Sequence, residues 1–256
     1  LASELENLIL KEGPETVAAF FAEPVMGAGG VIIPPKSYFP KVQKVLEKYD
    51  ILLVADEVIC GFGRTGNMWG SETFNIRPDI VTAAKALSSA YLPISAVIIS
   101  EKVYGPIKDQ ANELGIFGHG YTYSAHPVCA AVAMKAQQIM IDRNIIANVK
   151  QLSKLFNERI QNIKNNSWFL SHSRSVGLIG AVEFGYEGNK KFDIKNKIAA
   201  KCAKIIQENG VILRALPGDI IGFCPPLIIK EEQINEMFDK IDIAFKNFDE
   251  MAFNLK

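Results

Sequence analysis

Residues 51–56, ILLVAD, form a short apolar run that ends in a carboxylate, Asp56. A second run, DIVTAAK at residues 79–85, ends in a lysine, Lys85. Short aliphatic runs bounded by turn signals predict strands that are buried on both faces, and ligands of open α/β sheets bind beyond the carboxyl ends of such strands. We therefore expect Asp56 and Lys85 to lie together beyond the carboxyl ends of two strands.

The first half of the chain alternates between strand and helix patterns, as βαβ units do, which predicts an α/β fold with a mainly parallel sheet. A helical stretch at residues 126–165, interrupted near residues 142–144, is long enough to bridge two domains. The remainder has the pattern of a small α+β domain. The other expected elements are strands at residues 17–22, 51–55, 79–82, 94–99, 177–184 and 211–214, and helices at 37–49, 194–209 and 230–251.

The composition is typical of a soluble globular protein. Among 256 residues, 48% are hydrophobic and the formal net charge is zero, so the basic excess of nucleic-acid-binding proteins is absent. No apolar run approaches the roughly 20 residues that span a bilayer. The four cysteines show neither CxxC pairing nor the density of a disulfide scaffold, which predicts a reducing, cytoplasmic location.

Lys85 is a candidate nucleophile. Its neighbours at residues 83–89 are small or apolar, so we expect partial desolvation of the ammonium, which favours the neutral amine that Schiff-base chemistry requires. A lysine at the end of a strand is also commonly a solvated surface charge. Lys85 by itself does not distinguish these two interpretations.

Asp56 makes the chemical interpretation more specific, because a carboxylate at the end of a buried strand is costly unless a cation meets it. A protonated pyridine nitrogen is such a cation. Pyridoxal phosphate chemistry combines a lysine that holds the aldehyde with an acidic group that keeps the ring nitrogen protonated. The alternative is a structural ion pair of Asp56 with Lys85 or with Arg64.

Other segments carry weaker signals. The glycine-rich loops at residues 27–30 and 61–66 lack the spacing of a dinucleotide fingerprint, and turn geometry is the simpler interpretation. Residues 118–124, GHGYTYS, offer hydroxyl and backbone N–H groups to a phosphate, or form a hairpin. Arg214 is a candidate carboxylate-binding fork or a surface ion pair. The three histidines lack metal-ligand spacing, so we expect no metal site.

Taken together, these segments resemble the class III pyridoxal-phosphate aminotransferases. Their order and spacing match that family, and in particular its ω-amino acid:pyruvate branch, which includes β-alanine:pyruvate-type enzymes. The resemblance covers essentially the whole chain. The segments that carry it are EPV at 23–25, GAGG at 27–30, ADEVICGFGRTG at 55–66, PD at 78–79, KALSSAYLP at 85–93, GHGYTYSAHP at 118–127 and PPLII at 225–229.

The resemblance implies a fold-type I pyridoxal-phosphate transferase. Residues 1–155 would then be the C-terminal part of the large cofactor-binding domain, and residues 156–256 the small α+β domain. Lys85 would be the Schiff-base lysine and Asp56 the partner of the pyridine nitrogen, while Val58 would pack on one face of the ring.

The same resemblance implies partners for the site. Tyr121 and Thr122 would reach the cofactor phosphate of the other subunit of a homodimer, and Arg214 would clamp the carboxylate of the amino acceptor. The implied reaction moves an amino group from an amine or ω-amino acid to a keto acid such as pyruvate. It involves small molecules and neither nucleic acid nor a membrane.

The chain also departs from the family pattern. Ala86 replaces the glycine that commonly follows the lysine, and the family's Gly-Ser phosphate loop and ring-stacking aromatic residue lie upstream of the position of Leu1. The chain resembles roughly the C-terminal half to three-fifths of the family's usual length. We therefore expect a fragment, and the alternative function is a catalytically silent fragment that binds pyridoxal phosphate weakly or not at all.

Overall fold

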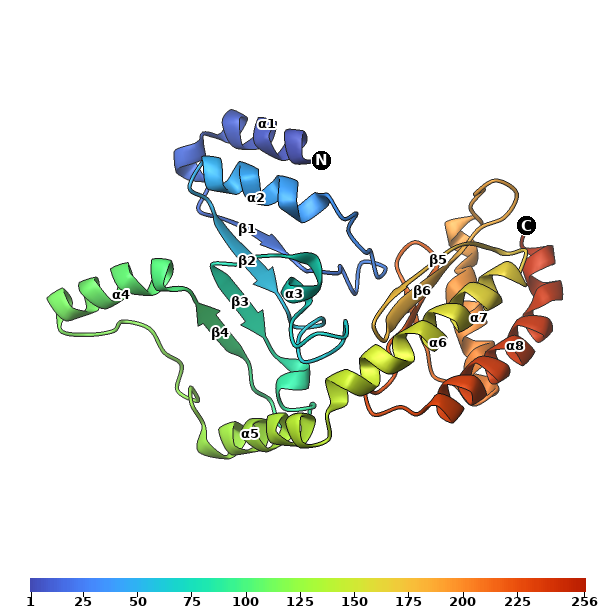
Figure 1. Cartoon of the computed structure of the whole chain (residues 1–256). Coiled ribbons are helices and arrows are strands. Elements are labelled where there is room, and N and C mark those ends of the chain that lie inside the picture. Colours follow the sequence, from blue (N-terminus) through green and yellow to red (C-terminus); the bar gives the residue numbers. More distant parts are fainter. The chain divides into compact units, whose positions relative to one another are not determined.

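The computed structural model describes all 256 residues, and the chain divides into two compact units (Figure 1). Unit 1 comprises residues 1–24, 34–62 and 67–144, and unit 2 comprises residues 25–33, 63–66 and 145–256. Two short loop segments thus belong to unit 2 although their neighbours in sequence belong to unit 1. Whether residues 1–155 and 156–256 act as functional domains stays a prediction.

Unit 1 is built on a sheet of four strands in the order β1-β2-β3-β4. The strands β1, β2 and β3 are parallel to one another, and β4 is antiparallel to β3. The sheet is therefore mainly parallel, as the alternating pattern predicted. The strands are β1 (Ala19–Ala22), β2 (Leu52–Asp56), β3 (Ile80–Ala83) and β4 (Ala96–Ile99).

Helices cover part of this sheet. Phe39, Val42 and Leu46 recur at helical spacing in α2 and are buried with Leu53 of β2 and Ile9 of α1. Each fully buried side chain of this size contributes about 1.5–3 kcal/mol. The helices of unit 1 are α1 (Ala2–Glu12), α2 (Tyr38–Lys48), α3 (Gly70–Phe74), α4 (Glu101–Leu114) and α5 (Pro127–Asp142), with short 3₁₀ turns η1 (Pro14–Thr16) and η2 (Lys85–Leu87).

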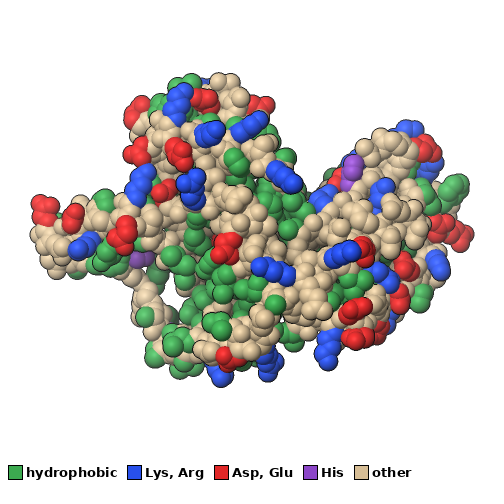
Figure 2. All heavy atoms as spheres, in the orientation of Figure 1, with side chains coloured by type: hydrophobic (Ala, Val, Ile, Leu, Met, Phe, Trp, Pro, Cys, Tyr) green, Lys and Arg blue, Asp and Glu red, His purple; other side chains and the backbone are tan.

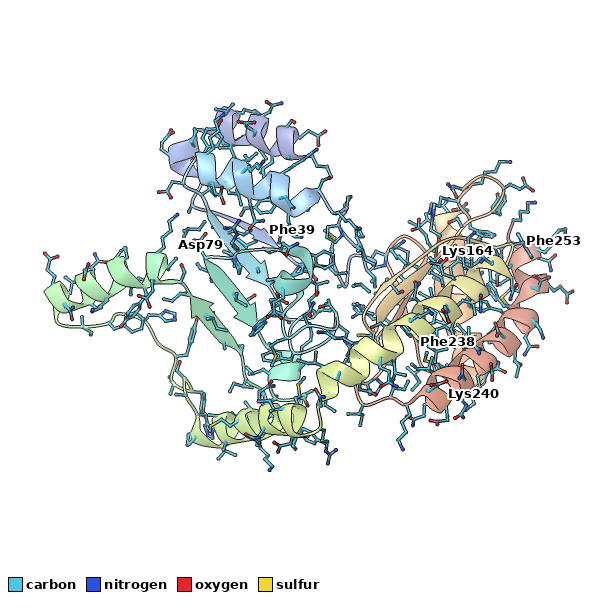
Figure 3. All side chains as sticks on the ribbon, in the orientation of Figure 1. Phe39, Asp79, Lys164, Phe238, Lys240 and Phe253 are labelled. Atoms are coloured by element: carbon cyan, nitrogen blue, oxygen red, sulfur yellow. The ribbon has the colours of Figure 1, made fainter.

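Asp79 fixes the start of β3 against its neighbouring strands. Its Oδ2 accepts a hydrogen bond from the backbone N–H of Leu53 (2.9 Å), and its own N–H donates to the Leu53 carbonyl (2.8 Å). The Asp79 carbonyl also accepts from the N–H of Ser100 (2.8 Å). Asp79, labelled with Phe39 in Figure 3, is therefore a structural carboxylate. It bonds β2 near the start of that strand, whereas Asp56 is the last residue of β2.

Unit 2 contains an antiparallel sheet with strand order β5-β6-β8-β7. Helix α6 packs along β5, and α8 packs against both α6 and α7. The elements are α6 (Ile145–Asn165), β5 (Leu170–Val176), β6 (Ile179–Phe184), η3 (Ile194–Asn196), α7 (Ile198–Glu208), β7 (Arg214–Leu216), β8 (Ile220–Phe223) and α8 (Glu231–Asn254).

Aromatic side chains form much of the core of unit 2. Phe169 stacks on Phe184 and meets the rings of Phe245 and Phe248 edge-on. Phe238, labelled on α8 in Figure 3, stacks on Phe223 at 5.7 Å between ring centroids. This core lies within unit 2 alone, so residues 145–256 have the apolar burial of an independent α+β unit.

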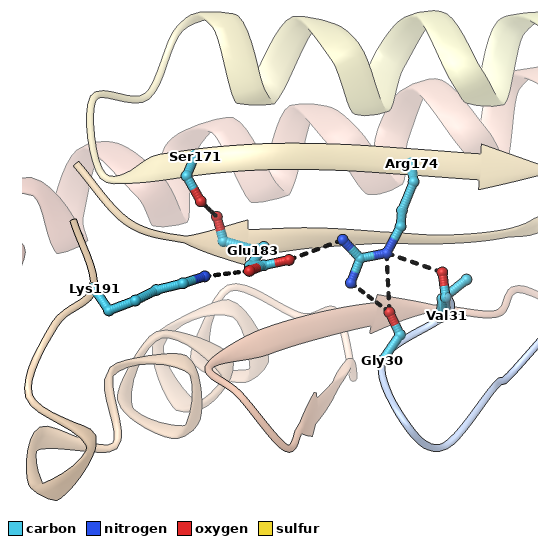
Figure 4. A network of polar contacts seen from close by, with 6 residues as sticks. All are labelled: Gly30, Val31, Ser171, Arg174, Glu183 and Lys191. Atoms are coloured by element: carbon cyan, nitrogen blue, oxygen red, sulfur yellow. Dashed lines mark hydrogen bonds and ion pairs between the residues drawn. The ribbon is translucent and has the colours of Figure 1, made fainter. Parts of the chain in front are cut away.

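A charged network holds the loop of residues 25–33 within unit 2 (Figure 4). The Arg174 guanidinium donates to the carbonyl oxygens of Gly30 (Nη2, 2.6 Å) and Val31 (Nε, 2.9 Å). It also donates from Nη1 to Oε2 of Glu183 (2.9 Å), whose other oxygen accepts from Lys191. Burial raises the pKa of Glu183, but the hydrogen bonds from Lys191 and Arg174 outweigh it, so the pKa lies below the ordinary value.

The structure also corrects the sequence prediction. The predicted strand at residues 211–214 is wrong: residues 211–213 form no strand, and Arg214 begins β7. The pairing of Leu216 with Ile220 places β7 beside β8, across a turn in which Gly218 and Asp219 have positive φ. Because this hairpin turn sets the register, the strand starts later than its apolar residues suggest. Strands β5 and β8 and helices α3 and α4 were not predicted.

The predicted interruption of the long helix is confirmed, since α5 ends at Asp142 and α6 begins at Ile145. Asn144 between them has a φ of 49°, a left-handed conformation that ends a helix. None of the helices has the combination of length and apolar content that is needed to cross a membrane. Acidic and basic side chains are interspersed on the face shown in Figure 2, in keeping with a net charge of zero.

Candidate active site

Asp56 and Lys85 lie at the same edge of the unit 1 sheet. Asp56 is the last residue of β2, and its Cα pairs with that of Thr82 in the parallel strand β3. Strand β3 ends at Ala83, and Lys85 opens the turn η2 immediately beyond it. Because the two strands run in the same direction, both charged residues emerge at the carboxyl edge, where ligands of such sheets bind.

Asp56 is a half-buried residue, and a backbone group nearby in the chain orients its carboxylate. Its Oδ1 accepts a hydrogen bond from the backbone N–H of Val58 at 3.0 Å. No ion pair joins Asp56 to Lys85, so that alternative interpretation does not hold for this structure. Arg64 belongs to unit 2, and its pairing with Asp56 stays a prediction.

Lys85 has an unusual backbone conformation, with a φ of 44° in the left-handed region. Its carbonyl oxygen accepts hydrogen bonds from the N–H groups of Ser88 (3.2 Å) and Ala90 (3.1 Å), which closes a tight turn. A residue other than glycine in this region costs roughly 1–3 kcal/mol, and such strain is found most often at functional sites. Holding Lys85 in this conformation therefore lowers the stability of the fold.

The expected desolvation of Lys85 is not observed in this chain, where its side chain is exposed. The reason is the turn itself. Ala86 and Leu87 are only half-buried and Ser89 and Ala90 are exposed, so the small neighbours that suggested an apolar environment do not enclose the ammonium.

Glu57 is a buried charge whose role was not predicted from the sequence. It is fully buried, and its carboxylate accepts hydrogen bonds from the N–H of Gly70 (2.8 Å) and from the N–H (2.6 Å) and Oγ (2.5 Å) of Ser71. These donors lie in the first turn of α3, so Glu57 satisfies its free N–H groups. The signal in the sequence was a second carboxylate directly after Asp56.

The glycine loop after β2 is explained by close packing. A Cβ on Gly61 would lie 2.8 Å from the Glu57 carbonyl oxygen and 3.1 Å from the Trp69 ring. No side chain fits there without displacing the backbone. At Gly61 the reason for glycine is therefore close packing, whereas the sequence predicted turn geometry.

Tyr121 and Thr122 lie in an exposed turn between α4 and α5. The N–H of Tyr121 donates to Oγ of Ser124 (2.9 Å), and the residue is 78% exposed. The segment forms no hairpin strands. The predicted contact of Tyr121 and Thr122 with the cofactor phosphate of the other subunit stays a prediction.

Arg214 belongs to unit 2, where it is exposed at the start of β7. Its Cα pairs with Gly222 of β8. A separate pocket of about 730 Å³ in the same unit is lined by Arg174, Glu183 and Lys191, and these charges pair with one another. None of the predicted site residues lines that pocket.

The model of the family described as Aminotransferase class-III matches residues 1–245 of this sequence. The chain belongs to this family. Its fold is that of the pyridoxal-phosphate-dependent transferases, as the resemblance implied.

Relatives of this class III aminotransferase chain include plant transaminases. It is 47% identical over 258 residues to a probable gamma-aminobutyrate transaminase 2, mitochondrial, of Oryza sativa subsp. indica, with all of the chain and 52% of the relative covered. It is 49% identical to gamma aminobutyrate transaminase 3, chloroplastic, of Solanum lycopersicum, with 49% of that relative covered. The chain thus spans about half the length of the curated relatives it matches.

The chain also matches solved structures of transaminases. A transaminase with L-ala matches 98% of the chain at 46% identity and a TM-score of 0.94, with 59% of that structure covered. The omega transaminase from Pseudomonas jessenii in complex with PMP matches 98% of the chain at 43% identity and a TM-score of 0.94, with 56% covered. The relatives' names place them in mitochondria or a chloroplast, and a cytoplasmic location for this chain stays a prediction.

The residues at the carboxyl edge fit the family's cofactor, pyridoxal phosphate, by their donor chemistry. An aldehyde requires an amine, which Lys85 supplies in an exposed position. A pyridinium nitrogen requires a carboxylate, and Asp56 is oriented by Val58 without being neutralised by Lys85. The pair that the sequence singled out is therefore chemically suited to this group.

Proposed function

We propose that this chain is the part of a class III transaminase that carries its catalytic lysine. It would move an amino group from an amine or ω-amino acid to a keto acid such as pyruvate. The observation that carries the proposal is the register of β2 and β3, which brings Asp56 and the strained Lys85 turn to one edge of the sheet.

Lys85 and Asp56 would divide the chemical work. Bound pyridoxal phosphate would supply an electron sink for a substrate carbanion. Asp56 would hold the proton on the ring nitrogen, and Val58 would pack against one ring face. The Lys85 amine would hold the aldehyde between turnovers. During a turnover it would act as general base and remove a proton from the substrate carbon, and then as general acid deliver that proton to the cofactor carbon that carried the aldehyde. Its exposed position leaves it room to move between these tasks.

Tyr121, Thr122 and Arg214 would complete the site in a homodimer. Tyr121 and Thr122 would bind the phosphate of the partner's cofactor, which fits their exposure in a turn that is rich in hydroxyl groups. Arg214 would bind the carboxylate of the keto acid through its guanidinium fork. The names of the plant relatives support an ω-amino acid such as γ-aminobutyrate as the amino donor.

A second candidate is a catalytically silent fragment that binds pyridoxal phosphate weakly or not at all. It is supported by the exposure of Lys85, because the small residues next to it do not enclose its ammonium. The two candidates differ in whether this chain, by itself, takes up the cofactor at Lys85.

The test is to add pyridoxal phosphate to the purified chain, reduce with borohydride and locate the fixed cofactor by mass spectrometry. We expect a visible absorbance band that borohydride bleaches, fixation at Lys85, and loss of both in Lys85→Ala. Lys135→Ala, which changes an exposed lysine on α5, is the matched control and should retain them. Absence of the band and of fixation at Lys85 would overturn the proposal for this chain.

A second experiment tests amino transfer. The chain is incubated with pyruvate and a set of amines and ω-amino acids, γ-aminobutyrate and β-alanine among them, and alanine is measured. We expect at least one donor to give alanine, and Asp56→Asn to lower the rate about 100-fold or more, because a charge that stabilises the reacting group is removed. If the cofactor is fixed at Lys85 but no donor reacts, the silent fragment is the better description.

A further inference from the structure

Gln137 on α5 is hydrogen-bonded to the turn that carries Lys85. Its Nε2 donates to the carbonyl oxygens of Ala86 (3.0 Å) and Leu87 (2.9 Å), which lie 51 and 50 residues earlier in the chain. Figure 1 shows α5 beside the turn that follows β3. One side chain therefore bonds both carbonyl groups that follow Lys85 in η2.

The amide oxygen of Gln137 is in an unfavourable environment. Gln137 Oε1 is buried and has no hydrogen-bond partner. Rotation of the amide by half a turn would place this oxygen against two carbonyl oxygens, so the two donated bonds fix its orientation. A buried acceptor without a partner is unfavourable, and an apolar side chain would avoid it. The buried neighbours on α5 are indeed apolar: Ala133, Ala136 and Met140.

The turn that Gln137 contacts is strained. Lys85 has a φ of 44°, and Ser89 and Ala90 have φ values of 51° and 60°. Such conformations persist only where the surrounding structure holds them. Within the turn, Ser88 Oγ donates to the Leu92 carbonyl (2.6 Å), and Gln137 is a long-range side chain that bonds it from another element.

We infer that Gln137 is a positioning residue that holds the Lys85 turn in its strained conformation. The amide contacts the backbone next to Lys85 and not its amine, so it acts through the turn. The consequence for reactivity rests on the proposed function of Lys85, whereas the effect on the turn does not.

The first test measures the turn in the cofactor-free chain. Hydrogen exchange is followed at the amides of Leu87, Ser88 and Ala90, which donate within the turn, in wild type and in Gln137→Met. We expect about tenfold faster exchange in Gln137→Met, because two hydrogen bonds to the turn are lost. Amides of β2 and β3 should be unchanged, whereas a general loss of stability would accelerate them too.

The matched control is Gln138→Met. Gln138 is the next residue on α5, is exposed, and donates to Asp142 on its own helix (2.6 Å) instead of to the turn. It should leave the exchange in η2 unchanged. Equal exchange in wild type and Gln137→Met would overturn the inference. If Gln137→Met does not fold, the same exchange experiment is made with Gln137→Asn. This variant keeps the amide, but its side chain is one methylene shorter and reaches less far toward the turn.

The second test measures the reactivity of Lys85. Borohydride fixation of pyridoxal phosphate is timed at Lys85 and, in the same sample, at the exposed Lys135. We expect fixation at Lys85 to slow severalfold in Gln137→Met and to be unchanged in Gln138→Met, with Lys135 equal in all three proteins. An unchanged rate at Lys85 would contradict a positioning role. If wild type takes up no cofactor at Lys85, the proposed function fails, while the exchange experiment still decides whether Gln137 holds the turn.

Discussion

The carboxyl edge of the unit 1 sheet and the charged network of unit 2 use ionic side chains in opposite ways. In unit 2, the Arg174 guanidinium bonds two backbone carbonyl groups and Glu183, and Glu183 also bonds Lys191. In unit 1, the Asp56 carboxylate accepts one hydrogen bond from the backbone, and Lys85 is exposed in a strained turn.

This difference separates charges that stabilise the fold from charges that are available for chemistry. A fully bonded, half-buried ionic group cannot exchange partners without a large loss of stability. Asp56 and Lys85 have few partners to lose, so a ligand can bind them without breaking the fold. Glu57 shows how local the distinction is, because it follows Asp56 directly and is fully bonded.

Replacing Arg174 should have the largest effect on stability. Arg174→Met leaves the carbonyl groups of Gly30 and Val31 and the carboxylate of Glu183 without this donor, and we expect a loss of about 3 kcal/mol. Urea unfolding measures it. The control is Lys240→Met, which breaks an exposed pair with Glu236 and should cost less than about 0.5 kcal/mol. Equal losses of stability in the two variants would show that the Arg174 network stabilises the fold no more than an exposed ion pair does.

Glu57 should behave as a structural carboxylate. Glu57→Gln removes an acceptor oxygen and introduces N–H groups beside the donors of Gly70 and Ser71, so we expect a loss of about 1–3 kcal/mol. Thermal unfolding checks this expectation. Glu72→Gln changes the exposed carboxylate that accepts from the N–H of Trp69 at the same helix, and should cost only about 0.5 kcal/mol.

Replacing Lys85 should stabilise the fold, in contrast to replacing Arg174 or Glu57. Glycine adopts a positive φ without strain, so Lys85→Gly should raise the free energy of unfolding by about 0.5–1 kcal/mol. The control is Lys135→Gly, in the exposed middle of α5, which should lower it by about 1 kcal/mol. A destabilising Lys85→Gly would show that the lysine side chain contributes to the fold, which the exposed position argues against.

The stability of unit 2 should depend on pH through the ionisation of Glu183. Its pKa in the folded chain lies below the ordinary value of 4.5, with its charged form bonded to Lys191 and Arg174. The stabilisation is therefore fully present above pH 4.5 and is lost as the pH falls through the folded pKa. Melting temperatures of wild type and Glu183→Gln between pH 7 and pH 3 should converge at the acid end. A constant difference would show that ionisation of Glu183 is not the cause.

Much of the fold could be predicted from local pattern. The four strands of unit 1 and the break between α5 and α6 lie within two residues of their predicted limits. The apolar runs around Leu53 and Val81 carry this information within a few residues. By contrast, β7 was placed incorrectly and β8 was missed, because their register depends on a hairpin pairing and not on a long apolar run.

The family, the parallel core of the unit 1 sheet, and the choice of Asp56 and Lys85 as the candidate pair could all be predicted from the amino-acid sequence. These follow from residue types in a fixed order along the chain. The folded chain was needed to show that Lys85 is exposed and strained, that Glu57 caps α3, and that Gln137 bonds the turn. Exposure and hydrogen-bond partners depend on which distant segments pack together, and no local pattern in the sequence specifies that.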